Sequence, residues 1–422
     1  MRIELVNTGS ELLLGRVLNT HQQWICRQLA DAGYEVTRQV AIADTGPAIC
    51  EGTKEALSRS DLVIVTGGLG PTADDITRDK IAELLECELR EDAGTVERIR
   101  EFFARRKRPM PERTRIQAMI PETAEIITNH HGTAPGLLID INPNRFGGGI
   151  TPACLIMLPG PPRELRPMFV EQVLPIIRDR FPLGAEFACR TLKSTGVGES
   201  LMEEWLLEPL RELEKRGLVV GFCARTGEVD VRLAASGPDS TGIVSEAVQI
   251  ALSVAGEHIY GSEDEKIEEV VVRLLSERNE TVALAESCTG GYIGHRITNV
   301  SGASAVFLAS HVTYSNEAKQ RMLGVSKDTL AAHGAVSEAV AKEMADGCRE
   351  RSGANYAIAV TGIAGPTGGT EDKPVGTVFG ALASKKGTTV FKRINSFDRE
   401  TFKFVTAQQG LELLRKEIMN TG

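Results

Sequence analysis

The stretch VALAESCTGG, residues 282–291, decides the fold of the C-terminal part of this chain. Its first four residues are apolar, and the hexapeptide Glu286–Gly291 is small or polar. Ile293, Ile297 and Val300 then follow at helical spacing. This order predicts a buried strand, a tight turn and the start of a helix. We therefore expect Ser287 in the turn, at the carboxyl end of the strand.

The turn suits more than one kind of chemistry. Glycine lets backbone N–H groups near a helix N-terminus face a ligand oxygen, which makes Thr289, Gly290 and Gly291 candidate ligand contacts. An exposed Ser287 would suit a nucleophile beside an oxyanion site. A passive phosphate cradle and a simple capped helix explain the same pattern. Cys288 is a rival nucleophile, but a thiol needs electropositive surroundings to ionise, so Ser287 is favoured.

Lys319 is the candidate base for such a serine. Ser315 or Asn316 is expected to cap a helix that carries Lys319 in its first turn. A cation is unfavourable there because of the helix dipole. Burial and the dipole would lower the pKa of the lysine, so that it acts as a base toward a serine. An exposed lysine in an ordinary first turn explains the sequence equally well.

A second glycine-rich loop follows another apolar run. Tyr356–Val360 predicts a buried strand, and Thr361–Gly369 after it suits the polar half of a ligand. Arg399, farther along the chain, suits a bidentate contact with a phosphate. Asp398 beside it is an alternative partner for the guanidinium.

The N-terminal part predicts a parallel α/β unit, because strands and helices alternate along it. Ligands of such sheets bind outside the carboxyl ends of the strands. The buried strand Leu62–Val65 runs into a loop with three glycines that allow close approach to a phosphate. Asp74 and Asp75 in this loop suit a divalent cation, although either could simply cap the next helix. The candidate ligand contacts here and in a later proline-rich turn are Gly67, Gly68, Gly70, Thr72, Pro159 and Gly160.

Residues 171–262 predict a small α+β region. A long amphipathic helix over Glu199–Arg216 precedes two short strands, Val219–Cys223 and Glu228–Ala234. The region has no catalytic signature, and it lacks the Gly-x-x-Gly clamp of one class of nucleic-acid-binding domains. We expect a spacer or docking domain.

Bulk properties limit the class of protein. A chain of 422 residues is too long for a domain with one ordinary hydrophobic core, so we expect two or three domains. The net charge of −9 argues against direct nucleic-acid binding, which needs a basic face. Eight irregularly spaced cysteines without Cys-x-x-Cys pairs indicate reduced thiols. With no signal peptide or membrane-spanning run, we expect a soluble, cytoplasmic protein.

Motifs along the whole chain resemble the full-length CinA family of competence/damage-inducible proteins. Gly9–Gly15, Gly67–Asp75, Gly132–Gly136 and Leu158–Glu164 resemble its N-terminal domain, which is similar to molybdopterin-binding proteins. Glu286–Gly291, Tyr314–Lys319, His333–Glu338 and Thr361–Gly369 resemble its C-terminal amidohydrolase domain. The expected architecture is a doubly wound α/β domain over 1–170, a small α+β domain over 171–262 and an α/β amidohydrolase domain over 263–422.

The resemblance implies that the C-terminal domain deamidates nicotinamide mononucleotide and releases ammonia without a cofactor. In the family scheme Ser287 attacks the carboxamide and Lys319 activates it, while Tyr314 and Ser304 support the proton path or orient the amide. Thr361, Gly362 and Arg399 would hold the nucleotide. Asn316 is a further candidate contact.

For the N-terminal domain, the resemblance implies a second activity of some relatives, the hydrolysis of ADP-ribose with a divalent metal. Glu11, Asp74 and Asp75 would then be the metal ligands. The resemblance also implies a homodimer whose partners are small-molecule nucleotides. The charge and the lack of a membrane-spanning run argue against nucleic acid and membrane as partners. The alternative is a binding protein without turnover, either for molybdopterin or for a protein partner in competence or recombination.

Overall fold

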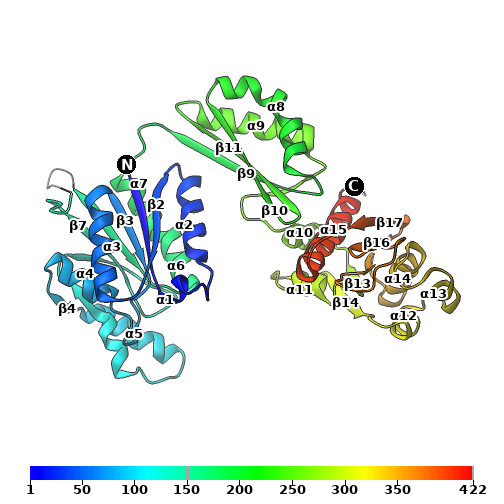
Figure 1. The fold of residues 1–422 in the computed structure, drawn as a ribbon, viewed down its shortest axis with the longest axis horizontal. Coiled ribbons are helices and arrows are strands. Elements are labelled where there is room, and N and C mark those ends of the chain that lie inside the picture. The colour runs from blue at the N-terminus through cyan, green and yellow to red at the C-terminus, as the bar shows by residue number, and fades with distance from the viewer. Residues whose placement is uncertain (148–151, 421–422) are drawn as a thin grey trace. The chain divides into compact units, whose positions relative to one another are not determined.

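The computed structural model describes residues 1–147 and 152–420, which form two units, Met1–Ala188 and Cys189–Gly422 (Figure 1). The predicted boundary after residue 170 falls inside the short helix η2 (Phe169–Val173). Helix α7 (Leu174–Arg180) continues in the same unit, and Phe169, Val173 and Ile177 are fully buried in its core. The N-terminal unit therefore extends to Ala188.

The N-terminal unit is built on one six-stranded sheet with the strand order β2-β1-β3-β8-β7-β6. The four strands β2, β1, β3 and β8 are parallel, whereas β7 and β6 are antiparallel additions at one edge. The sheet is therefore mixed, and its parallel half matches the expectation. The strands are β1 (Ile3–Thr8), β2 (Val36–Ile42), β3 (Leu62–Thr66), β6 (Ala124–Ile127), β7 (Gly136–Ile141) and β8 (Ala153–Leu158).

Helices cover both faces of this sheet, as expected for a doubly wound domain (Figure 1). Leu62 and Ile64 of β3 pack with the helices of one face, and Val63 and Val65 pack with those of the other. This alternation arises because successive side chains of a strand point to opposite faces of the sheet. One face carries α2 (Thr20–Asp31), α6 (Pro162–Met168) and α7, and the other carries α3 (Gly46–Arg59) and α4 (Thr77–Leu85). The remaining elements are α1 (Ser10–Leu13), β4 (Leu89–Glu91), α5 (Ala93–Arg105), η1 (Glu112–Ala118) and β5 (Met119–Pro121).

The second unit begins with a four-stranded sheet of order β10-β11-β9-β12. Helix α8 (Glu199–Lys215) forms where the amphipathic pattern predicts it, because Met202, Leu206, Leu210 and Leu213 share one buried face. It packs against α9 (Ser240–Ala255). The strands are β9 (Phe187–Thr195), β10 (Leu218–Arg225), β11 (Glu228–Ser236) and β12 (Ile259–Ser262).

The rest of the second unit is built around β13 (Val282–Glu286), in a five-stranded sheet of order β14-β13-β15-β16-β17. β13 is parallel to both of its neighbours, so the turn after it lies at an edge where strand carboxyl ends meet. The other strands are β14 (Phe307–Val312), β15 (Tyr356–Gly362), β16 (Thr377–Ser384) and β17 (Gly387–Ile394). The helices are α10 (Ile267–Arg278), α11 (Tyr292–Thr298), η3 (Ala303–Ala305), α12 (Asn316–Leu323), α13 (Lys327–His333), α14 (Glu338–Ser352) and α15 (Arg399–Met419).

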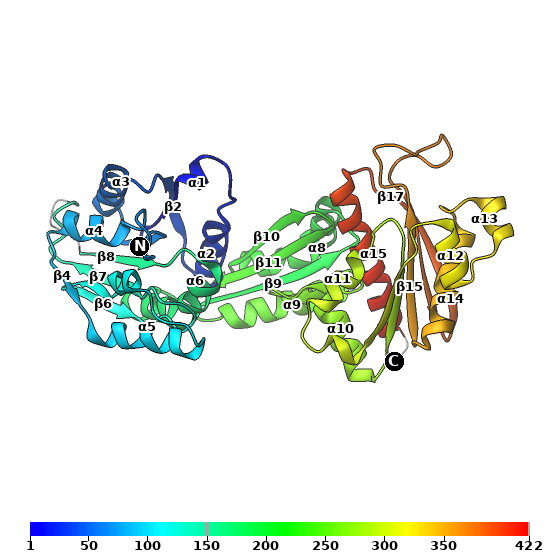
Figure 2. The same cartoon turned by 90° about the horizontal axis from the view of Figure 1, so that it is seen from below.

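The two faces of this sheet differ in side-chain size. Val282 and Leu284 pack toward α10, α11 and α15, whereas Ala283 and Ala285 pack toward α14. Figure 2 shows α15 and α14 on opposite sides of the strands. The small side chains let α14 approach the sheet closely, and together the two layers hold the end of β13 firmly. Within the described residues, no helix combines the length and apolar character needed to cross a membrane.

Candidate active site

The turn after β13 has the geometry that its sequence predicts. Ser287 follows the last strand residue, its N–H donates to the Val360 carbonyl (3.1 Å), and its carbonyl accepts from the N–H of Gly290 (3.1 Å). Gly290 and Gly291 have φ values of +63° and +95°, a region that disfavours side chains. The chain can therefore reverse at once into α11, and Ser287 is kept at the carboxyl edge of the sheet.

Lys319 reaches this serine from α12. Ser315 caps that helix by accepting from the N–H of Ala318 (3.1 Å), which places Lys319 in the first turn. Its Nζ lies 3.0 Å from Ser287 Oγ and donates to the Thr313 carbonyl at 2.7 Å. The contact joins residues that are 32 positions apart in the chain.

The surroundings of Lys319 favour its neutral form. The residue is 1% exposed, and no carboxylate in the described parts of the chain makes an ion pair with it. Burial therefore lowers its pKa, against a smaller opposing effect of the Cys288 thiol. A neutral amine at this position can accept the Ser287 proton, so the arrangement of the two side chains suits a nucleophile and its base. The reading of Lys319 as an ordinary exposed lysine is wrong.

The pair opens into a pocket of about 280 Å³. Arg399 lies across it and donates to the Gly365 carbonyl (2.9 Å) and the Tyr314 hydroxyl (2.7 Å). Asp398 caps α15 instead of pairing with Arg399, since its carboxylate accepts from the first N–H groups of that helix. The lining also contains the predicted residues Thr361 and Gly362 at the end of β15.

Some predicted site residues do not reach this pocket. Ser304 lies in η3, before β14, and β14 runs parallel to β13, so Ser304 is at the amino edge of the sheet, opposite to Ser287. The predicted role of Ser304 in the proton path is therefore wrong for the site that a single chain forms. Asn316 is exposed on α12 and does not line the pocket. Thr289, Gly290 and Gly291 do not line the pocket either.

Cys288 is poorly suited to be the nucleophile. Its side chain is 6% exposed, and burial raises the pKa of its thiol to about 12. The thiolate is the reactive form, so this cysteine is inert near neutral pH. The structure supports the preference for Ser287.

Glu286 is a buried residue of the turn to which the sequence assigned no role. Its carboxylate accepts from the Thr289 hydroxyl (2.7 Å) and from the N–H groups of Gly291 (3.0 Å), Ile293 (3.1 Å) and Gly294 (2.9 Å). These donors at the start of α11 were expected to face a ligand, and that expectation is wrong. A glutamate that ends an otherwise apolar strand was the available signal.

The N-terminal unit has a separate pocket of about 430 Å³ at the carboxyl ends of its parallel strands. It is lined by the predicted residues Gly67, Gly68, Gly160, Glu11, Asp74 and Asp75. The sequence missed His21 and Asp44, which also line it, and Gly70, Thr72 and Pro159 lie outside the lining. Gly67 and Gly68 adopt φ values of +98° and +68°, and a side chain on either would collide with Thr8 or Thr77.

The predicted metal ligands do not converge in this pocket. No three His, Cys, Asp or Glu side chains in residues 1–147 and 152–420 are grouped closely enough to hold a metal ion. Asp75 instead turns back to accept from the N–H (2.8 Å) and the hydroxyl of Thr72. The alternative, that Asp74 or Asp75 caps the next helix, is also wrong, because no side chain caps α4. As arranged here, Glu11, Asp74 and Asp75 do not fit a metal site.

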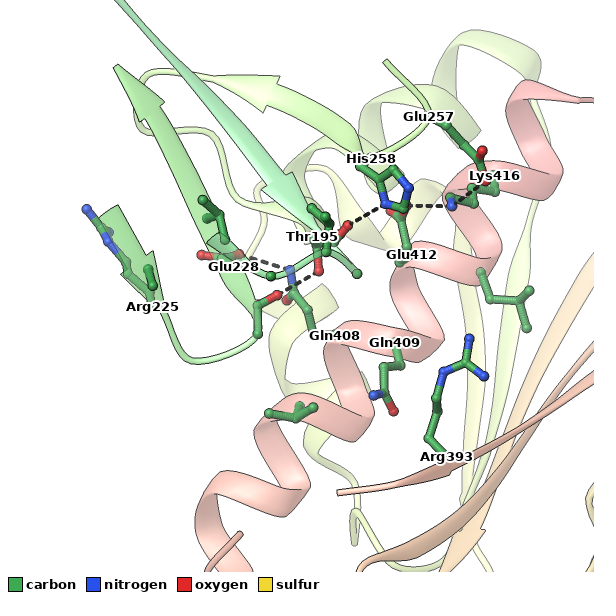
Figure 3. A pocket seen from close by; sticks show the side chains of 18 of the residues that line it. Thr195, Arg225, Glu228, Glu257, His258, Arg393, Gln408, Gln409, Glu412 and Lys416 are labelled. Carbon is green, nitrogen blue, oxygen red and sulfur yellow. Dashed lines mark hydrogen bonds and ion pairs between the residues drawn. The ribbon is translucent and has the colours of Figure 1, made fainter. Parts of the chain in front are cut away.

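A larger cleft of about 710 Å³ lies between the four-stranded sheet and α15 (Figure 3). Its charged groups are largely paired: Gln408 donates to Glu228 (2.9 Å), and Lys416 pairs with Glu257 (2.8 Å). No predicted site residue lines it. The chemistry of the second unit therefore centres on the Ser287 pocket.

Three family models match successive parts of the chain. Residues 4–179 match the model described as a probable molybdopterin binding domain, 189–261 the damage-inducible protein CinA KH domain, and 264–418 the CinA C-terminal domain. The part matched by the KH model contains no Gly-x-x-Gly sequence.

Full-length relatives are similar along almost the whole chain. A CinA-like protein of Akkermansia muciniphila is 41% identical, covering 97% of this chain and 96% of its own. A CinA-like protein of Chlorobaculum tepidum is 43% identical, covering 91% of this chain and 90% of its own. Among solved structures, the competence/damage inducible protein CihA from Agrobacterium tumefaciens is 41% identical, with 36% of this chain and 94% of that chain covered and a TM-score of 0.34.

Proposed function

This chain belongs to the CinA family, and on that premise we propose that its C-terminal domain hydrolyses the carboxamide of nicotinamide mononucleotide to nicotinate mononucleotide and ammonia. The observation that carries the proposal is the 3.0 Å contact between Lys319 Nζ and Ser287 Oγ in a pocket that the guanidinium of Arg399 also lines. A serine paired with a buried amine suits acyl transfer from an amide.

The proposed reaction has two halves. Neutral Lys319 accepts the Ser287 proton while the serine oxygen attacks the carboxamide carbon. The resulting ammonium form of Lys319 then protonates the leaving nitrogen. Ammonia departs, and the substrate acyl group remains as an ester of Ser287. In the second half Lys319 deprotonates water, which attacks the ester, and the protonated lysine returns its proton to Ser287 as the acid leaves.

The substrate anion is assigned to Arg399. Two of its N–H groups are used by Gly365 and Tyr314, which fixes the orientation of the guanidinium and leaves other donors for a phosphate.

The test is ammonia release from nicotinamide mononucleotide, without added metal, by wild type and the Ser287→Ala and Cys288→Ala variants. We expect release by wild type and by Cys288→Ala, and none by Ser287→Ala. Full activity of Ser287→Ala would refute the mechanism. Absence of release by a well-folded wild type would refute the substrate assignment and favour a binding protein without turnover.

For the N-terminal unit we propose a nucleotide pocket at Gly67, Gly68 and Gly160. Its position beyond the carboxyl ends of parallel strands supports this, since such crevices bind ligands in many α/β proteins. ADP-ribose hydrolysis, assayed with and without Mg²⁺, distinguishes turnover from binding alone. Binding of ADP-ribose without hydrolysis under both conditions would leave this unit as a binding domain.

A further inference from the structure

The carboxylate of Glu286 is an unusual feature beside the reactive pair. It is fully buried, and no cation in the described part of the chain makes an ion pair with it. Its carboxylate instead accepts from the hydroxyl of Thr289, from three N–H groups at the start of α11 and, at 3.4 Å, from the hydroxyl of Ser310 on β14. These N–H groups belong to the first turn of a helix, where the helix dipole makes a carboxylate a favourable neighbour.

The contact differs from the other helix caps of this domain. Ser315, Ser326, Ser337 and Asp398 each cap the helix that they immediately precede. Glu286 instead reaches across the whole turn to partners three to eight residues ahead, and it also accepts from Ser310, 24 residues ahead on β14. Ser287 lies in the chain between Glu286 and its partners at the start of α11. The hydrogen bonds of the Glu286 side chain therefore connect the two ends of the turn that carries Ser287.

The main chain of the same residue connects to the base. The Glu286 carbonyl accepts from the N–H of Thr313 (2.8 Å), and the Thr313 carbonyl accepts from Lys319 Nζ (2.7 Å). Glu286 thus immediately precedes the nucleophile and is one hydrogen bond from the residue that holds the base. A change in its side-chain contacts is expected to move both Ser287 and Thr313.

We propose that Glu286 is a positioning residue that keeps Ser287 Oγ and Lys319 Nζ at the distance and orientation that proton transfer between them requires. This inference rests on the proposed function of the pair. Displacement of a reacting group by about 1 Å is enough to lower a rate by about 10²-fold. Glu286 itself is not among the residues that line the pocket, so it acts through the turn. Arg399 lies on a different element, α15.

The variant that tests this is Glu286→Gln, which keeps the side-chain volume but loses the charge and one acceptor oxygen. We expect kcat for nicotinamide mononucleotide to fall at least about tenfold, with KM within about threefold of wild type. The matched control is Glu412→Gln, which changes another buried carboxylate of this domain, one that pairs with Arg415 within α15 (2.7 Å). We expect wild-type kcat from the control.

A second readout does not depend on the substrate. A fluorophosphonate probe reacts with an activated serine, forming an oxygen–phosphorus bond at Ser287 as fluoride leaves, and intact-mass analysis measures the rate. We expect this rate to fall at least about tenfold in Glu286→Gln, in parallel with kcat. If wild type is labelled at Ser287 but releases no ammonia, the proposed substrate fails, and the labelling ratio still decides the role of Glu286.

Equal labelling rates and equal kcat per folded molecule in wild type and Glu286→Gln would overturn the proposal and leave Glu286 as a helix cap. If circular dichroism shows that Glu286→Gln does not fold, Thr289→Val decides, because it removes one donor and keeps the carboxylate. We expect a loss of at least about threefold in the labelling rate of Thr289→Val. An unchanged rate would then overturn the proposal.

Discussion

Replacing Lys319 by methionine separates the catalytic role of this residue from its effect on stability. Methionine keeps an unbranched apolar side chain of similar length in a site that is 1% exposed. It removes the amine that contacts Ser287 and Thr313. Activity and stability are therefore expected to change in opposite directions.

The loss of activity follows from the role of a base. A positioned general base typically contributes about 10²–10⁴ to a rate, which corresponds to about 2.7–5.4 kcal/mol of barrier. We expect kcat to fall by that factor in Lys319→Met. The exposed Lys327, which lies in the first turn of α13, provides a matched control, and Lys327→Met is expected to keep wild-type kcat.

The expected gain in stability reflects the cost of burying Lys319, whose amine is charged in the unfolded chain and makes no ion pair with a carboxylate in the described part of the folded chain. Replacing buried charges by apolar groups of similar volume is often neutral or stabilising, here by about 1–3 kcal/mol near neutral pH. The folded-state pKa of Lys319 lies below the ordinary value of 10.5, so the unfolded chain binds more protons between these two values. This group therefore makes the free energy of unfolding of wild type rise with pH across that window. Its cost is complete below the folded pKa and disappears above 10.5.

Urea unfolding at a series of pH values, together with ammonia release, tests both effects. We expect Lys319→Met to be at least as stable as wild type at neutral pH, and the difference to shrink as the pH rises toward 10.5. Wild-type activity in the variant would refute the assignment of Lys319 as the base. A large loss of stability, about 2 kcal/mol or more, would refute the argument that its charge is costly in the folded state.

Three further outcomes are expected. Ser287→Ala is expected to lose more than about 10³-fold in kcat while Cys288→Ala stays within about threefold, as measured by ammonia release, because a thiol with a pKa of about 12 is protonated. Arg399→Ala is expected to raise KM about tenfold or more with a smaller change in kcat, since a charge-assisted contact contributes about 1.5–3 kcal/mol. An unchanged KM in steady-state kinetics would contradict the phosphate contact. Arg59→Ala is expected to lower the free energy of unfolding of the N-terminal unit by about 2 kcal/mol in urea, because it removes the bidentate partner (2.7 and 2.9 Å) of the fully buried Glu4; ammonia release by this variant should equal that of wild type.

Local patterns were sufficient for the elements that carry the site. The strand, turn and helix around Ser287 were predicted from an apolar run, two glycines and helical spacing, all within one short stretch. The cap at Ser315 and the amphipathic α8 have the same local origin. In each case the deciding interactions join residues a few positions apart, so the sequence contains the information directly.

Predictions failed where strand direction or side-chain orientation decided the outcome. Ser304 was grouped with the site, but it precedes a strand parallel to β13 and so lies at the opposite edge of the sheet. Asp75 was expected to bind a metal or cap a helix, and it turns back to Thr72 instead. The domain boundary was placed too early, because η2 and α7 bury apolar residues in the N-terminal core.

The sequence alone determined the α/β class of both units, the position of the turn that carries Ser287 and, through a family resemblance, the pairing of Ser287 with Lys319. Only the tertiary structure decided that Lys319 is buried with no ion pair to a carboxylate among the described residues, that Arg399 donates to Tyr314 while Asp398 caps α15, and that Glu286 accepts the donors of the turn. The physical reason is that a pKa and a hydrogen-bond partner depend on every group that surrounds a side chain. Those groups come from strands and helices that are far apart in the sequence and meet only when the sheet forms.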